Sequence, residues 1–368
     1  MKPAIVLWGI SRPSQMDFAG CNPNGGIFAP TIRYHEGNFY ITSTNVNHPG
    51  AFSPDGSGNF IITAKNPAGE WSDPIWMNQG GIDPSLFFDE DGRTYYTSTK
   101  NITGEDGVNR SAIQMSEIEI TTGKLLTESK VISEGCGGRF PEGPHLYKID
   151  GYYYLLLAEG GTELGHRVTI SRSRTIWGPY EGCPHNPILT AMDENDPSLS
   201  ALGHADIVET EAGTWWMVFL CQRLTEQYYH HLGRETGIAP FEWVNGWPIV
   251  NGGKAPTEEM KIAGMPQIPL VREKHIHTNS HLSAGLGVQD VKCSAFHTNG
   301  HSTLGRGVPD VNCSTIHTTF EGEKLGLEWN FLRTFYQDYQ LNGNKLMLTG
   351  NQYSLNDNAT PAFIGRRQ

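Results

Sequence analysis

The chain has 368 residues, of which 18% are charged, and its formal net charge is −12. This acidic balance, with no compensating Lys/Arg run, argues against a nucleic-acid partner, because clustered basic side chains bind the phosphate backbone. No apolar run approaches the ~20 residues of a membrane-spanning helix, so we expect no membrane partner. The 43 glycines and 22 prolines favour many short strands joined by tight turns.

Two features bear on the cellular compartment. The short apolar run from Ala4 to Ile10 lacks a small-residue cleavage pattern, so we expect no signal peptide. The six cysteines form no C-x-x-C pair, which fits free thiols in a reducing compartment. Both features predict a cytoplasmic protein. The sequence does not indicate an oligomeric state.

One pattern recurs four times between residues 29 and 216. Each copy has a corner, an alternating strand, a turn containing glycine, and a second strand with an aromatic residue three positions beyond that glycine. We place the corners at Pro30, Pro84, Pro144 and Asp206, so the copies are 54, 60 and 62 residues apart. Such sheets recurring around an axis predict a β-propeller over residues 1–255.

Each copy is followed by further strand candidates. The third strands are predicted at 60–64, 112–115, 168–171 and 230–234. The segments 71–74 and 177–180 both begin with tryptophan and resemble each other, and we interpret them as linkers between blades.

Residues 256–318 differ from the propeller in character. They contain a 20-residue repeat, seen where Ile276–His281 recurs as Phe296–His301, and six of the 14 histidines. This composition raises a metal site as an alternative, but the repeat sets the histidine and cysteine spacing and no C-x2-C or H-x3-H kernel occurs. We expect a duplicated linker and no metal site.

Residues 319–368 again have globular character, with strands predicted at 325–331, 345–348 and 362–365. A segment of about 50 residues is too short to close a β-sandwich. We therefore expect an incomplete C-terminal β-sandwich.

The chemistry is expected at the corners, because the innermost strands of a propeller begin near its central channel. The corner residues that meet there are Ala29, Asp83, Glu142, His204 and Asp206. Glycosidic cleavage needs paired carboxyl groups, of which one donates a proton to the leaving oxygen and the other activates water or attacks carbon. Asp83 and Glu142 suit these roles.

Each of these residues also has a structural alternative. Asp83 precedes a proline and could form an Asx turn, and Glu142 could pair with Arg139. His204 could face the channel, bind a hydrated cation or simply be hydrogen-bonded within the fold. We expect no cofactor, and a structural cation such as calcium in the channel stays an open alternative.

Other side chains suit sugar binding. Phe28 and Phe140 lie beside the corners and offer aromatic faces for the C–H groups of a sugar. Arg234 supplies several fixed donors for hydroxyl groups and, beside Glu142, would also influence the acid.

Five segments of the chain resemble glycoside hydrolase family 43, and its β-xylosidase branch in particular. The resemblance covers about 1–255 and 319–368, and its motifs are 25–34 (GGIFAPTIRY), 81–87 (GIDPSLF), 141–145 (PEGPH), 203–206 (GHAD) and 231–236 (HLGRET). It implies a five-bladed propeller, a C-terminal concanavalin-like β-sandwich, and inverting enzymes that act on β-1,4-xylo-oligosaccharides and often on arabinofuranosides.

The resemblance also implies residue roles. Glu142 matches the general acid, and Asp83 matches the carboxylate that raises the pKa of the acid and orients it. Arg234 matches the active-site arginine, whereas Phe28 and His204 line the sugar subsite.

The base of the family is an Asp in a Pro-Asp-Pro-Ser segment of the first blade, and this sequence contains no such segment. We therefore expect a propeller that lacks most of its first blade, and Asp17 and Asp206 stay open as replacements for the base.

These observations predict a glycoside hydrolase that acts on xylo-oligosaccharides as an exo β-1,4-xylosidase, an α-L-arabinofuranosidase or both. It is expected to be inactive if no carboxylate replaces the base. The main alternative is a carbohydrate-binding propeller without turnover, and a fructan- or sucrose-type hydrolase on the same fold is less favoured.

Overall fold

The structure is a computed structural model. It describes residues 15–16, 25–46, 58–104, 106–194, 197–224, 229–230, 233–258, 325, 329–331, 338–342, 345–354 and 362–366. These residues form strands, loops and one short 3-10 helix, Asn251–Gly253. No helix among them is long and apolar enough to cross a membrane. The three cysteines within these ranges are free. The predicted 20-residue repeat lies outside the described residues.

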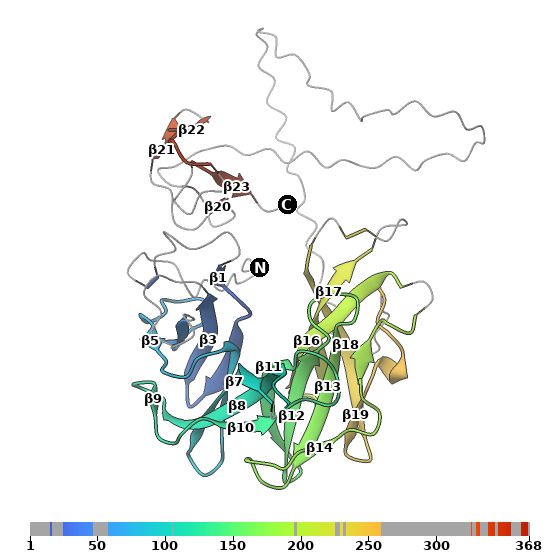
Figure 1. Cartoon of the computed structure of the whole chain (residues 1–368). Coiled ribbons are helices and arrows are strands. Elements are labelled where there is room, and N and C mark those ends of the chain that lie inside the picture. Colours follow the sequence, from blue (N-terminus) through green and yellow to red (C-terminus); the bar gives the residue numbers. More distant parts are fainter. Residues whose placement is uncertain are drawn as a thin grey trace, which may run out of the picture. The chain divides into compact units, whose positions relative to one another are not determined.

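Four antiparallel sheets follow one another along the chain (Figure 1). The first sheet contains β2 (Thr31–His35), β3 (Asn38–Val46), β4 (Gly58–Ala64) and β5 (Ile75–Trp76) in this order, and β1 (Gly26–Ile27) pairs with the far end of β3. The second sheet contains β6 (Ile82–Phe88), β7 (Thr94–Thr103) and β8 (Asn109–Glu119), and both β9 (Lys124–Leu125) and β10 (Lys130–Ser133) pair with β8.

The third and fourth sheets repeat this plan. The third contains β11 (Glu142–Ile149), β12 (Tyr152–Glu159) and β13 (Arg167–Ser173), and both β14 (Glu181–Gly182) and β15 (Leu189–Thr190) pair with β13. The fourth contains β16 (Leu199–Glu209), β17 (Trp215–Arg223), β18 (Glu235–Val244) and β19 (Trp247–Val250). The four predicted hairpins are therefore confirmed.

Tight turns fix the register of several hairpins. Glu36–Gly37 joins β2 to β3 and Asp150–Gly151 joins β11 to β12, and both residues of each turn have positive φ (46° and 80°, 50° and 74°). Two-residue turns with positive φ match the right-handed twist of the flanking strands. The glycine of each pair, and the aspartate of Asp150–Gly151, are residues that such turns favour.

The four sheets are arranged as blades, and the inner strands of the blades are β2, β6, β11 and β16. β2 contacts β6, β6 contacts β11, and β11 contacts β16. This arrangement confirms the all-β class and the propeller-like fold with four blades, whereas the fifth blade stays a prediction.

Apolar side chains fill the space between neighbouring blades. Between the third and fourth blades, Leu156 and Ile170 of one sheet belong to the same buried cluster as Leu202, Met217 and Phe219 of the other. Burying such a side chain fully contributes about 1.5–3 kcal/mol relative to leaving it exposed. The packed blades hold the beginnings of the inner strands in fixed positions.

Two sequence expectations need correction. The strand predicted at 230–234 begins only at Glu235, two residues after Gly233, whose φ is 72°. The segments 71–74 and 177–180 are not linkers between blades, because each runs into an outer strand of its own sheet, β5 or β14. Trp71 is buried against its own first sheet.

The C-terminal part has two pairs of strands, described here by themselves. β20 (Trp329–Phe331) pairs with β23 (Ile364–Arg366), and β21 (Tyr339–Asn342) pairs with β22 (Lys345–Leu348). The sequence predicted strands at three of these places but missed β21, which is only four residues long.

Candidate active site

The inner strands β6, β11 and β16 each carry a β-bulge at the same point. The first bulge residue is Asp83, Gly143 or His204, and these residues have positive φ values of 53°, 57° and 46°. A bulge redirects a side chain, and a residue other than glycine in this conformation costs about 1–3 kcal/mol. Asp83 and His204 therefore hold strained positions of the kind found at functional sites.

The bulges show that the predicted position of the fourth corner needs correction. When the copies are matched by their bulges, Pro84 and Pro144 correspond to Ala205 and not to Asp206. Asp206 instead corresponds to His145, one position further along the strand. The prediction is one residue out, because the turn of the fourth hairpin, residues 210–214, is longer than Asp150–Gly151 and the spacing of the repeat does not show this difference.

Two carboxyl groups dominate the electrostatics at the bulges. Asp83 is 6% exposed, and burial raises its pKa to about 7 against the opposing charge of Arg234. Burial and then the negative charge of Asp83 raise the pKa of Glu142 to about 7, while His204 and Arg234 oppose this rise. The two carboxyl groups therefore titrate as a coupled pair, in which a negative charge on Asp83 favours the protonated form of Glu142.

The imidazole of His204 lies against the backbone next to Glu142. A Cβ atom at Gly143 would come within 2.7 Å of His204 Nε2, so only glycine permits this approach. Burial lowers the pKa of His204, Glu142 opposes that effect, and Arg234 adds to it. The ring is therefore neutral near pH 7. Sequence analysis missed Gly143, although its place after Glu142 is a usable signal.

Arg234 completes the group. Its side chain is exposed, and its charge acts on Asp83, Glu142 and His204 together. The structure thus places four of the six predicted site residues within electrostatic reach of one another. Such a group can hold a proton on one carboxyl group while a cation balances the other.

The two predicted aromatic residues are both accessible. Phe140 is 52% exposed with a φ of 53°, and the guanidinium of Arg139 lies 5.2 Å from its ring centre. Phe28 is 37% exposed, and its backbone N–H donates to the carbonyl of Thr44 at 2.9 Å. In the described part of the chain, no hydrogen bond, ion pair or ring contact joins Phe28 to the other predicted residues.

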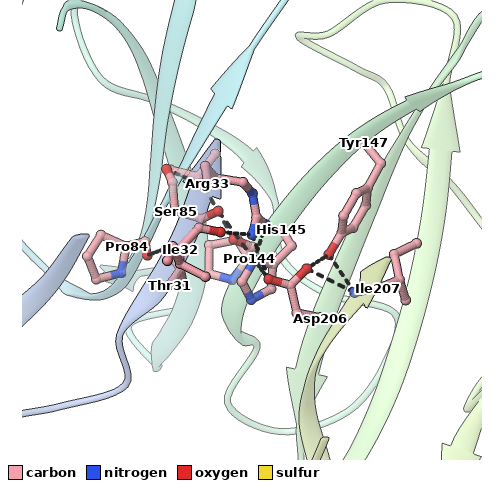
Figure 2. Close-up of polar contacts among 11 residues, drawn as sticks. Thr31, Ile32, Arg33, Pro84, Ser85, Pro144, His145, Tyr147, Asp206 and Ile207 are labelled. Atoms are coloured by element: carbon pink, nitrogen blue, oxygen red, sulfur yellow. Dashed lines mark hydrogen bonds and ion pairs between the residues drawn. The ribbon is translucent and has the colours of Figure 1, made fainter. Parts of the chain in front are cut away.

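A polar layer lies one position beyond the bulges (Figure 2). Arg33 Nη1 of the first blade donates to Asp206 Oδ2 of the fourth at 2.6 Å, and Arg33 Nη2 lies 2.7 Å from His145 Nδ1. Tyr147 donates its hydroxyl to Asp206, and Ser85 Oγ lies 3.3 Å from His145 Nδ1. The layer therefore joins all four blades, since Thr31 Oγ1 of the first blade also donates to the Pro84 carbonyl of the second.

Asp206 is ionised in this layer. Burial by itself would raise its pKa, but opposite charge and hydrogen bonds hold the pKa well below its usual range. Burial lowers the pKa of His145 to about 3, so this ring is neutral and the ionised state depends on Arg33 and Tyr147. The carboxylate of Asp206 is therefore engaged within the fold and not free to activate water. Asp17, the other open replacement for the base, lies outside the described residues.

Within the described ranges, no group of three or more His, Cys, Asp or Glu side chains is arranged to hold a metal ion. The histidines of the 20-residue repeat lie outside those ranges. The described site thus consists of carboxyl groups, an imidazole and a guanidinium.

Comparison with known proteins identifies the family. The profile of "Glycosyl hydrolases family 43" matches residues 9–248. The chain belongs to this family. A second profile, "Beta xylosidase C-terminal Concanavalin A-like domain", matches residues 317–368, which confirms the type of C-terminal domain predicted from the sequence.

Relatives within family 43 cover most of the chain. It is 37% identical over 370 residues to the "Non-reducing end alpha-L-arabinofuranosidase BoGH43B" of Bacteroides ovatus, covering 99% of this chain and 59% of that protein. It is 44% identical to a "Xylosidase/arabinosidase" of Butyrivibrio fibrisolvens, covering 66% of this chain and 47% of that protein. The chain thus spans about half the length of these relatives.

A solved structure agrees with both parts of the chain. The crystal structure of a xylan beta-1,4-xylosidase from Bacillus halodurans matches with a TM-score of 0.77 at 33% identity. The match covers 98% of this chain and 62% of the other. This likeness supports the fold described above.

Proposed function

We propose that the protein is an inverting glycoside hydrolase that cleaves xylo-oligosaccharides, as an exo β-1,4-xylosidase, an α-L-arabinofuranosidase or both. Family 43 membership supports the reaction class. The names of the relatives, which include a xylosidase and arabinosidase and an arabinofuranosidase, support the substrate class. The family match over residues 9–248 further supports a five-bladed ring as the architecture to which the four described blades belong.

The observation that carries the proposal is the placement of Glu142 within electrostatic reach of Asp83, His204 and Arg234. Burial and the charge of Asp83 raise the pKa of Glu142 to about 7, which keeps this carboxyl group largely protonated in mildly acidic solution, as a general acid requires. Glu142 thus donates its proton to the glycosidic oxygen, and Asp83 sustains that proton by its negative charge. Arg234 and the neutral His204 bind sugar hydroxyl groups, and the exposed rings of Phe28 and Phe140 contact the C–H faces of the sugar.

Inversion also requires a carboxylate that activates water about 6.5–9.5 Å from the acid. The Pro-Asp-Pro-Ser segment of the family is absent from this sequence, and Asp206 is bound by Arg33 and Tyr147. The first measurement is therefore whether the wild-type chain hydrolyses xylobiose.

The experiment compares the wild-type chain with Glu142→Gln on xylobiose and on aryl β-xyloside and aryl α-L-arabinofuranoside. General acid catalysis contributes about 10²–10⁴-fold, so hydrolysis of xylobiose should fall by that factor. The loss should be smaller for a nitrophenyl glycoside, because nitrophenolate leaves without needing a proton. NMR of the first product should show an inverted anomeric centre.

Two outcomes contradict the proposal. Undiminished hydrolysis of xylobiose by Glu142→Gln would remove this residue from the role of acid. Calorimetric binding of xylobiose by the wild-type chain without any turnover would support a carbohydrate-binding propeller instead.

A further inference from the structure

Glu159 is a buried charged residue that the proposed mechanism does not use. It is the last residue of β12 and is 0% exposed. Its carboxylate accepts the backbone N–H groups of Cys136 at 2.5 Å and Gly138 at 2.7 Å, and the Thr169 hydroxyl at 3.1 Å. Arg167 Nε lies 3.8 Å away. A buried carboxylate is costly unless donors form hydrogen bonds with it. These hydrogen bonds require a specific backbone conformation of the segment around Gly138.

The segment 135–139 is shaped around this carboxylate. A Cβ atom at Gly138 would lie 2.1 Å from Glu159 Oε2, and one at Gly135 would lie 2.8 Å from Glu159 Oε1. Gly135 and Gly137 also have positive φ values of 91° and 100°. The glycines thus let the backbone wrap the carboxylate, which no other residue type would permit at Gly138.

The wrapped segment leads directly into the candidate site. The backbone N–H of Gly160, next to Glu159, donates to the carbonyl of Arg139 at 2.6 Å. Glu142 pairs with Ala158 in the same hairpin. Between these two anchor points lies Phe140, exposed and held at positive φ. A strained conformation of this kind persists only where its surroundings determine it.

We propose that Glu159 is a positioning residue, which anchors segment 135–141 and thereby places the Phe140 ring for contact with a sugar. This inference rests on the proposed function. The carboxylate acts through the segment and touches no substrate. Glu159→Gln keeps the size of the side chain but places an amide NH₂ group against one of the two backbone N–H donors, so the anchor is weakened while the volume is kept.

The experiment has a binding arm and a proteolysis arm, both on the full chain. Xylobiose is titrated calorimetrically into wild type, Glu159→Gln, Phe140→Ala and the double variant. We expect Glu159→Gln to weaken binding by about tenfold, which is the scale of one aromatic contact. The double variant should bind no more weakly than Phe140→Ala, because Glu159 acts through that ring. Glu209→Gln is the matched control, since Glu209 also ends a strand but is exposed.

The proteolysis arm does not depend on sugar binding. Trypsin should cleave after Arg139 several-fold faster in Glu159→Gln than in wild type, with the site identified by mass spectrometry. If Glu159→Gln does not fold, Gly138→Ala disturbs the same contact from the other partner and replaces it in both arms.

The outcomes separate the two proposals. Unchanged cleavage after Arg139, or additive losses of binding in the double variant, would overturn the role of Glu159. If wild type neither binds nor hydrolyses xylobiose, the proposed function fails and the sugar contact of Phe140 fails with it, while the cleavage rates still decide whether Glu159 anchors the segment.

Discussion

Asp83→Asn tests how the site keeps a proton on Glu142. The substitution preserves shape and removes the negative charge that, after burial, is the second cause of the raised pKa of Glu142. We assign that charge about one pKa unit, which corresponds to about 1.4 kcal/mol. The pKa of Glu142 should then fall from about 7 toward about 6, so the protonated fraction at pH 7 falls from about one half to about one tenth.

The assay is the pH dependence of kcat/KM for xylobiose between pH 4.5 and 9. The alkaline limb should move to lower pH by about one unit in Asp83→Asn, and activity at pH 7 should fall about fivefold from this effect alone. If the chain does not turn over, ¹³C NMR of labelled glutamate reports the titration of Glu142 directly. Because the two carboxyl groups are coupled, the measured values belong to the pair.

The matched control is Asp91→Asn. Asp91 lies in the turn at the far end of the same hairpin and is exposed, so its charge is screened from Glu142 by solvent and salt. Its removal should leave the alkaline limb in place. An alkaline limb that stays unchanged in Asp83→Asn, or that moves to higher pH, would refute the electrostatic role of Asp83.

Two further predictions concern the backbone and the polar layer. Gly143→Ala places a Cβ atom 2.7 Å from His204 Nε2 at a residue with a φ of 57°. The variant should lose about 1–3 kcal/mol of stability, seen as a lower melting temperature, and xylobiose binding should weaken; unchanged binding would contradict the fit. Arg33→Met leaves the 26% exposed Asp206 side chain without its cation, and urea unfolding should show a loss of about 3 kcal/mol. Because the pKa of Asp206 is depressed in the folded state, its contribution is present above the unfolded pKa near ~4 and is lost as the pH falls further. The gap between wild type and Arg33→Met should therefore narrow in acid, and a constant gap would argue against the ion pair.

Local patterns were sufficient to predict the hairpins of the fold. A turn such as Asp150–Gly151 followed by an aromatic residue encodes two strands and their register within a dozen positions. Glu142 and Asp83 could be identified for the same reason, because both lie beside a proline corner that recurs.

Long-range contacts could not be predicted in this way. Arg33 and Asp206 are 173 positions apart in sequence, and nothing near either residue indicates its partner. The bulges were also missed, since one extra residue in a strand leaves no compositional trace. The fourth hairpin also has a longer turn, residues 210–214, than Asp150–Gly151, and this difference displaced the fourth corner to Asp206.

The three matched bulges have a consequence for how this protein can change. Asp83, Gly143 and His204 occupy one backbone position in three successive blades, with nearly the same left-handed φ. Because aspartate, asparagine and histidine tolerate that conformation better than most residues other than glycine, the backbone permits exchange among these residue types at positions 83 and 204, whereas the close approach of His204 keeps position 143 a glycine. New arrangements of acid, imidazole and open space around the channel mouth can therefore arise by single substitutions, without rebuilding a strand.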